Sequence, residues 1–190
     1  MLNQTSITQA SRINAIPESL LAASRELNNV QLIDNSFKGK FILWGNPDDK
    51  VFTDAIYNRL GLHLPMNSGN VTAVGPYTAI WANPKRWYLI CEKEEEANLS
   101  MSLVKSGQVH MSVTDGQCCF QLAGPHAVDI LKKGCSLNFN ETHFSTGQCL
   151  QTRLAITKVF LHRLQTERFQ IYVERSYGEY VWRWLLSAAR

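Results

Sequence analysis

One order of secondary structure occurs twice along this chain of 190 residues, and this repetition limits the possible folds more than any other feature. Each half is expected to run strand, helix, strand, strand, helix. These segments span residues 37–44, 50–60, 71–81, 87–92 and 94–106 in the first half, and 109–122, 125–133, 150–164, 169–174 and 177–189 in the second. Antiparallel strands backed by helices form an α+β layer arrangement. The pattern predicts an α+β fold with an N-terminal arm (1–31), a first unit (32–108) and a second unit (109–190).

Residues with capping chemistry predict where the helices begin and end. The pair Asp48–Asp49 can accept hydrogen bonds from the first free amides of helix 50–60, and Gly61 can adopt the left-handed conformation that ends a helix. Ser176 and Glu179 have the spacing of a capping box, in which each side chain bonds the other residue's backbone amide. We therefore expect the last helix to begin at this box.

The last helix carries more apolar surface than one sheet can cover. At 100° per residue, one face holds Tyr177, Tyr180, Val181, Trp184, Leu185 and Ala188. Trp182 and Leu186 lie beyond that arc, and an exposed pair of this kind is typical of a protein interface. We predict that Trp182 and Leu186 bind a partner subunit. The alternative is that the N-terminal arm, with a short helix after Pro17, folds over them.

Composition excludes several classes of partner and location. The net charge is only +3, the 19 basic residues are scattered, and the dense charge run at 92–96 is acidic, so nucleic-acid binding is not expected. No stretch reaches the roughly 20 apolar residues of a membrane helix, and the polar N-terminus does not resemble a signal peptide. Five cysteines, an odd number, indicate reduced thiols. We expect a soluble, cytoplasmic protein with no membrane or nucleic-acid partner.

Residue patterns of catalytic and metal sites are missing from the sequence. It has no glycine-rich dinucleotide or phosphate loop, no nucleophile elbow, no H-E-x-x-H and no C-x-x-C. The prediction is therefore no catalytic, cofactor-binding or metal-binding residue. Arg153, Arg163 and Arg175 recur in the second half, and one of them could hold an anionic ligand such as a folate glutamate tail. The preferred interpretation is that these arginines form ion pairs at the surface or at an interface. Arg153 and Arg175 are therefore candidates for binding a partner.

Particular residues of the second half resemble the gamma subunit of heterotetrameric sarcosine oxidase. The resemblance rests on the run Gly134-Cys135-Ser136-Leu137, then Phe144, Gly147, Cys149, Gln151-Thr152-Arg153-Leu154 and His162-Arg163. It continues through Phe169-Gln170-Ile171-Tyr172-Val173, Arg175-Ser176-Tyr177, Tyr180, Trp182 and Trp184-Leu185. Upstream it includes Trp81, Pro84, Trp87, Gly116 and Leu122-Ala123-Gly124-Pro125. It covers about Leu32 to Ala189 and departs at Ser112, where the family often has an acidic residue.

This resemblance implies a fold like the folate-binding domains of the glycine-cleavage T-protein. It also implies an accessory, non-catalytic subunit of an enzyme that demethylates sarcosine to glycine, releases hydrogen peroxide and passes the one-carbon unit to tetrahydrofolate. FAD, FMN, NAD, tetrahydrofolate and zinc would be carried by other subunits, and the partners would be the alpha, beta and delta subunits. The alternatives are a free-standing folate-binding or aminomethyltransferase-like protein, an assembly factor, and a gamma-like subunit of a related enzyme such as N-methylglutamate dehydrogenase.

Overall fold

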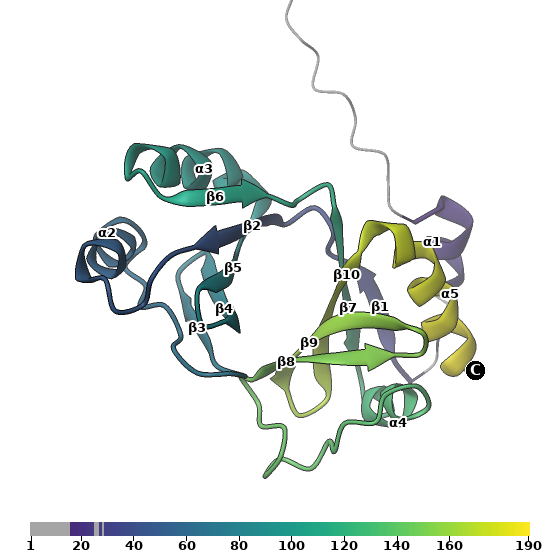
Figure 1. Ribbon diagram of the computed structural model, residues 1–190. Helices are drawn as coiled ribbons and strands as arrows, with labels where there is room; N and C mark the ends of the chain where they lie inside the picture. The colour runs from purple at the N-terminus through teal and green to yellow at the C-terminus, as the bar shows by residue number, and fades with distance from the viewer. Residues whose placement is uncertain (1–15, 25–26, 28) are drawn as a thin grey trace, which may run out of the picture.

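Two antiparallel sheets with the same strand arrangement form the frame of the protein (Figure 1). The computed structural model describes residues 16–24, 27 and 29–190. In the first sheet the strand order is β3 (Val71–Val74), β4 (Tyr77–Asn83), β5 (Arg86–Cys91), β2 (Gly39–Trp44), β6 (Val109–Ser112). In the second it is β8 (Cys149–Leu154), β9 (Thr157–Gln165), β10 (Arg168–Glu174), β7 (Gln117–Ala123), β1 (Gln31–Asp34). The predicted α+β repeat is therefore present.

The two units exchange their first strands. β1 pairs with β7 of the second sheet, with Asp34 opposite Phe120, and β6 pairs with β2 of the first sheet, with Ser112 opposite Phe41. The sheets therefore do not divide at residue 108 as predicted, and the single strand expected over 109–122 is two strands in different sheets. A short alternating pattern indicates a strand but not which sheet edge it joins, and this explains the error.

Matching hydroxyl contacts fix the two crossing points. The Ser36 hydroxyl accepts a hydrogen bond from the Cys119 backbone amide at 3.1 Å, and the Thr114 hydroxyl accepts one from the Lys40 amide at 2.9 Å. Lys40 is fully buried at the crossing, and its Nζ donates to the Ser36 and Lys38 carbonyls at 2.8 and 2.9 Å. The exchange is therefore stabilised by buried or part-buried polar contacts on both sides, and not by the strand ladders alone.

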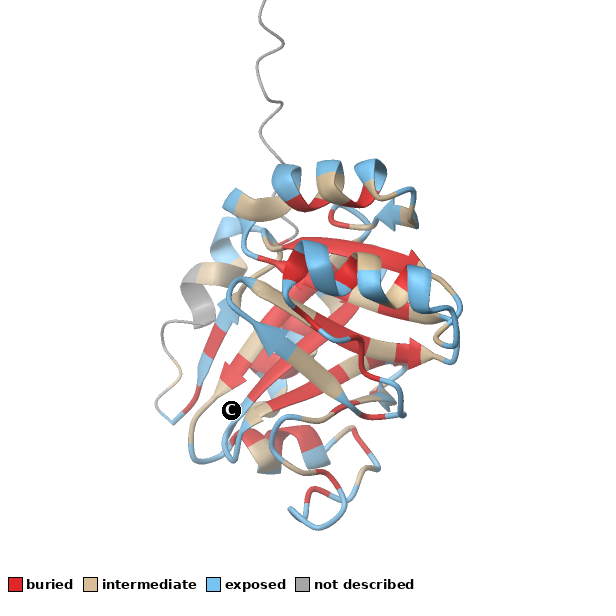
Figure 2. Ribbon diagram, turned by 90° about the vertical axis from the view of Figure 1, so that its left-hand side faces the viewer, coloured by how far each residue is buried: buried red, intermediate tan, exposed pale blue. Residues whose placement is uncertain are grey.

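Helices cover the outer face of each sheet, so that the inner faces meet in the middle of the molecule (Figure 1). The helices are α1 (Glu18–Ser24), α2 (Lys50–Leu60), α3 (Glu96–Lys105), α4 (Ala127–Lys132) and α5 (Gly178–Ala188). α2 and α3 pack on the first sheet in one hydrophobic core, and α4 and α5 pack on the second sheet in another. Figure 2 shows largely buried strands beneath helices that expose their outward faces. No helix in the described part of the chain is long and apolar enough to span a membrane.

Helix α2 begins and ends as predicted. Asp49 accepts from the Val51 and Phe52 amides, and Gly61 adopts φ 65° as the C-terminal cap. Two predicted long strands are instead hairpins, because the chain reverses at Gly75 (φ 55°) and at Ala155 (φ 51°). Both reversals put a positive φ at the first residue of a two-residue turn. Gly75 favours that conformation and Ala155 does not, so the second turn carries no sequence signal.

The predicted capping box at the last helix is wrong. A 3₁₀ turn over Arg175–Tyr177 precedes α5, and the Gly178 amide donates to the Arg175 carbonyl. No side chain caps α5. Glu179 instead pairs with Arg183 one turn further along the helix, at 2.7 Å. The backbone turn satisfies the amide at the start of α5, and the helix begins at Gly178, one residue later than the box predicts.

Candidate functional site

The face of α5 that was expected to be exposed is buried. Trp182 is fully buried and Leu186 is only 6% exposed. The Trp182 indole donates to the Leu20 carbonyl of α1 at 3.2 Å and packs edge-on against Phe120 at 5.0 Å. The predicted exposure is wrong because α1, in the N-terminal segment, covers this face, as the alternative reading proposed. Partner binding by Trp182 and Leu186 would require α1 to move away, and it stays an untested prediction.

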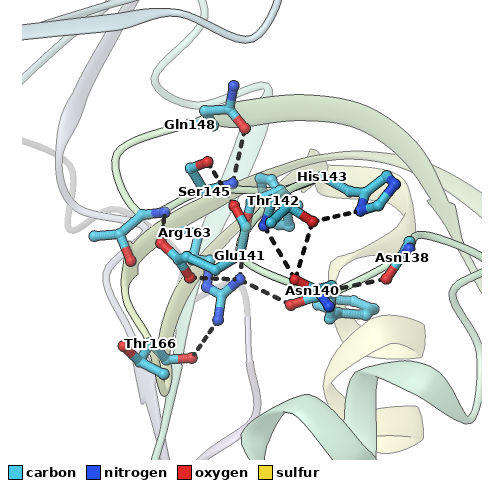
Figure 3. Close-up of polar contacts among 12 residues, drawn as sticks. Asn138, Asn140, Glu141, Thr142, His143, Ser145, Gln148, Arg163 and Thr166 are labelled. Atoms are coloured by element: carbon cyan, nitrogen blue, oxygen red, sulfur yellow. Dashed lines mark hydrogen bonds and ion pairs between the residues drawn. The ribbon is translucent and has the colours of Figure 1, made fainter.

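Arg163 holds a loop of its own chain. Its Nη1 donates to the Phe139 and Phe144 carbonyls at 2.9 and 2.6 Å, and its Nη2 donates to the Thr166 carbonyl at 3.2 Å. Glu141 pairs with the same guanidinium at 3.0 Å, as Figure 3 shows. The residue is 3% exposed. Both Nη atoms therefore bond the loop, while the buried Nε has no hydrogen-bond partner among the described residues. We assign Arg163 a structural role, because its side chain is almost fully enclosed by its own chain.

The loop that Arg163 organises is stabilised further by short-range polar contacts (Figure 3). The Asn138 side chain accepts from the Asn140 amide at 3.0 Å, and the Asn140 side chain accepts from the Thr142 amide at 3.1 Å. The Gln148 side chain accepts from the Ser145 amide at 2.8 Å. These contacts shape a long connection between α4 and β8 that has no regular structure of its own.

The other two arginines lie in separate places. Arg153 is exposed on β8, where its Nη2 donates to the Ile156 carbonyl at 3.3 Å. Arg175 is half-buried in the 3₁₀ turn before α5, and its amide donates to the Gly116 carbonyl at 2.9 Å. The structure therefore brings no two of the predicted arginines into one site.

Apolar contacts and hydrogen bonds join the inner faces of the two sheets. Ile80 and Ile90 of the first sheet pack with Cys119, Cys149 and Tyr172 of the second. The Tyr88 ring meets Phe160 edge-on at 4.8 Å. Two glutamines also cross between the sheets, since Gln117 donates to the Tyr88 hydroxyl at 3.2 Å and Gln151 to the Ala82 carbonyl at 2.9 Å. The two sheets are thus one packed body.

A cleft of about 680 Å³, here called the inter-sheet groove, opens beside this contact. Arg86 of β5, Arg153 of β8 and Lys158 of β9 line it, together with Tyr88 and Phe160. Glu174 is the only acidic residue among its described lining residues. Sequence reasoning found Arg153 but missed Arg86 and Lys158. Recognising the turn at Ala155 would have placed Lys158 opposite Arg153.

Burial makes Cys91, Cys118, Cys119 and Cys149 poor nucleophiles by raising their thiol pKa values. Burial raises the pKa of Cys91 and of Cys119 to about 12, and it raises the pKa of Cys149 further still. Cys118 lies in the core under α5 and Cys119 faces the other sheet, as adjacent residues of a strand must. Thiolate is the nucleophilic form, so these side chains offer little nucleophile at neutral pH.

The buried His162 is also unsuited to acid–base chemistry near neutral pH. Burial lowers the pKa of His162 to about 4, so its ring is neutral at neutral pH. The described residues contain no group of three or more His, Cys, Asp or Glu side chains placed to hold a metal ion. The inter-sheet groove differs from these groups in that three cations line one cleft.

Comparison with known proteins identifies the family. A model described as the sarcosine oxidase gamma subunit family matches residues 44–190. The chain belongs to this family. The match begins at the end of β2 and includes every later helix and strand of both units. The family predicted from the resemblance is confirmed.

Curated relatives of this gamma-family chain come from two bacterial genera. It is 29% identical over 132 residues to sarcosine oxidase subunit gamma of Corynebacterium sp. (strain U-96), which covers 67% of this chain and 64% of that protein. It is 26% identical over 174 residues to the subunit of Corynebacterium sp. (strain P-1), covering 88% and 84%. The match to the Arthrobacter sp. subunit is 26% identical over 140 residues and covers 70% and 68%. The chain thus spans just under two thirds of the first of these relatives.

Solved structures share the fold. A chain of heterotetrameric sarcosine oxidase from Corynebacterium sp. U-96 superposes with a TM-score of 0.80 at 24% identity, over 90% of this gamma-family chain and 89% of that one. Aminomethyltransferase T of the glycine cleavage system from Bartonella henselae gives 0.62 at 13% identity, over 88% and 48%. The predicted likeness to the T-protein fold is confirmed.

Proposed function

We propose that this chain is an accessory, non-catalytic subunit of a heterotetrameric enzyme of the sarcosine oxidase type. The observation that carries the proposal is the 0.80 TM-score to a chain of such a heterotetramer over 90% of this chain, together with the family match. The raised thiol pKa values and the neutral His162 support a non-catalytic role, because they leave these groups unsuited to nucleophilic or acid–base work near pH 7.

The partners in this proposal are alpha, beta and delta subunits, and the reaction is the demethylation of sarcosine with transfer of the one-carbon unit to tetrahydrofolate. FAD, FMN, NAD, tetrahydrofolate and zinc would then be bound by those other subunits. The chain would contribute a folded surface that completes the assembly. A related secondary-amine enzyme, such as N-methylglutamate dehydrogenase, would use the same kind of subunit.

Co-production with the large flavin-binding chains tests the proposal. A tag on this chain should recover a complex of fixed stoichiometry, measured by light scattering after gel filtration. The same complex should show a flavin absorption spectrum. Turnover of that complex should then be assayed with sarcosine and with N-methylglutamate, both by peroxide release and by reduction of an artificial electron acceptor. The second readout is needed because a dehydrogenase does not pass its electrons to oxygen. A chain that stays a monomer beside abundant large subunits contradicts the proposal.

The T-protein fold favours one second candidate, a free-standing folate-binding protein. Calorimetric titration of the purified chain with tetrahydrofolate separates the two. Saturable binding by the chain alone, without assembly, supports the second candidate. No heat of binding together with stable assembly supports the first.

A further inference from the structure

Two cations of the inter-sheet groove face each other on one hairpin. Arg153 of β8 lies directly opposite Lys158 of β9 in the strand register. Side chains in such positions have Cβ atoms about 5 Å apart, and like charges there destabilise the hairpin. Arg86 adds a third positive charge from the other sheet. The groove therefore concentrates positive charge, and this lowers the stability of the isolated chain.

These three cations form no ion pair with another described residue, although Glu174 also lines the groove. None of the ion pairs between described residues includes Arg86, Arg153 or Lys158. The Arg86 Nε atom is buried and has no hydrogen-bond partner, which is uncommon for a donor in a folded protein. The groove is thus short of negative charge, which a carboxylate would supply.

An apolar strip, half-buried at Trp44 and exposed at Val109 and Met111, continues from the groove along the same sheet face. Trp44 of β2 is opposite both Arg86 of β5 and Val109 of β6, so the three side chains point to one side. Val109 is 67% exposed and Met111, two residues on, is 50% exposed. Neighbouring strands are about 4.8 Å apart, so the strip begins one strand away from Arg86. We call Trp44, Val109 and Met111 the apolar strip.

The two features together point to a protein ligand. A small anion would neutralise the groove and leave the apolar strip in water. A polypeptide segment with carboxylates at one end and apolar side chains at the other would cover both, and exposed apolar patches beside polar ones mark protein interfaces. β6 is also an edge strand, so its free backbone groups can pair with such a segment.

We infer that an acidic segment of a partner subunit docks in the inter-sheet groove and over the apolar strip. This inference rests on the proposed function, since it identifies where the chain meets its assembly. Carboxylates of the segment pair with Arg86, Arg153 and Lys158, and apolar side chains of the segment pack on Val109 and Met111.

Charge reversal at Arg153 tests the inference. The full-length chain, immobilised, is titrated with the purified large subunits of its complex, and the association rate is measured at low and high salt. Arg153→Glu should slow association about tenfold or more at low salt. The difference from wild type should shrink near 1 M salt, where screening acts over about 3 Å. Met111→Ser, which adds no charge, should raise the dissociation rate with little effect on the salt dependence.

Folding and general charge effects are controlled separately. Arg153→Glu turns a like-charged cross-strand pair into an opposite one, so the melting temperature of the isolated variant should equal or exceed that of wild type. Lys50→Glu makes the same change of charge on exposed α2, behind the first sheet, and should associate within about twofold of wild type.

The outcomes separate this inference from the proposed function. If wild type does not bind the large subunits, the proposed function fails. If wild type binds and Arg153→Glu binds equally fast at low salt, the docking inference fails and the function stands. The inference also fails if millimolar phosphate or tetrahydrofolate stabilises wild type but not Arg153→Glu, because the groove would then hold a small anion.

Discussion

Replacing Arg163 with methionine should destabilise the protein far more than its one ion pair suggests. The guanidinium donates to three backbone carbonyls, of Phe139, Phe144 and Thr166, and is 3% exposed. Methionine fills similar volume but donates nothing, so these acceptors lose a charged partner. Phe139 and Phe144 are themselves buried, and water cannot easily replace the bonds.

The size of the loss follows from those contacts. A hydrogen bond to a charged group contributes about 1.5–3 kcal/mol, and a buried acceptor left unpaired costs about 1–3 kcal/mol. The two values describe the same bonds from different reference states, so they are not added. For Arg163→Met we expect a loss of about 3–5 kcal/mol, because up to three bonds of this kind are lost together. That is a large fraction of the 5–15 kcal/mol that stabilises an ordinary domain.

Glu141→Gln is the matched control. Glu141 pairs with Arg163 from a side chain that is 53% exposed, and it also accepts from the Thr146 amide at 2.6 Å. Glutamine keeps an acceptor for that amide, and the carbonyl bonds of Arg163 remain. We therefore expect a change in unfolding free energy that is small beside that of Arg163→Met.

Urea unfolding followed by circular dichroism measures both variants, and Arg163→Lys provides an intermediate if the methionine variant does not fold. Lysine keeps the charge but reaches fewer carbonyls, so its loss should be smaller. The reasoning is refuted if Arg163→Met costs less than about 1 kcal/mol, the worth of one ordinary hydrogen bond. It is refuted equally if Glu141→Gln costs as much as Arg163→Met.

Three other perturbations test other parts of the structure. Burial lowers the pKa of His162 from 6.5 to about 4, so between these values the unfolded chain binds a proton that the folded chain does not. The stabilisation linked to the neutral His162 ring is complete above pH 6.5, and about 3 kcal/mol of it is lost as the pH falls towards 4. Urea titrations across this range should show a smaller loss of stability in His162→Leu than in wild type. An equal loss would contradict the assignment of this pKa to His162. Trp182→Phe removes the indole bond to Leu20 and some buried area, so it should cost about 1–2 kcal/mol and speed proteolysis within α1; unchanged cleavage would argue against that contact. A methyl group at Gly134 would overlap the Trp184 ring, so Gly134→Ala should lower stability by about 1–3 kcal/mol in thermal unfolding, unless the ring moves aside freely.

Sequence reasoning succeeded where the determinants are local. Asp49 and Gly61 are sufficient to place the ends of α2, because capping depends on residues within one turn of each end. The capping box failed for a related reason. Its two side chains were present at Ser176 and Glu179, but a 3₁₀ turn had already satisfied the amide.

Features that depend on distant contacts could not be predicted. The amphipathic pattern of α5 shows that Trp182 needs cover, but it contains no information on whether α1 or a partner provides it. The inter-sheet groove is assembled from Arg86, Arg153 and Lys158, which come from different sheets. Two of them meet only because the chain reverses at Ala155, where no glycine or asparagine marks the turn.

The strand exchange has a consequence for the order in which this protein can be completed on the ribosome. β1 is made early, yet its partner β7 lies in the second unit, with Phe120 opposite Asp34. At 5–20 residues per second, β1 waits roughly 4–17 seconds for that partner to be synthesised. The first sheet likewise lacks its β6 edge until Ser112 has emerged. During synthesis both units therefore remain unfinished together, with open sheet edges that a chaperone or a waiting partner subunit could protect.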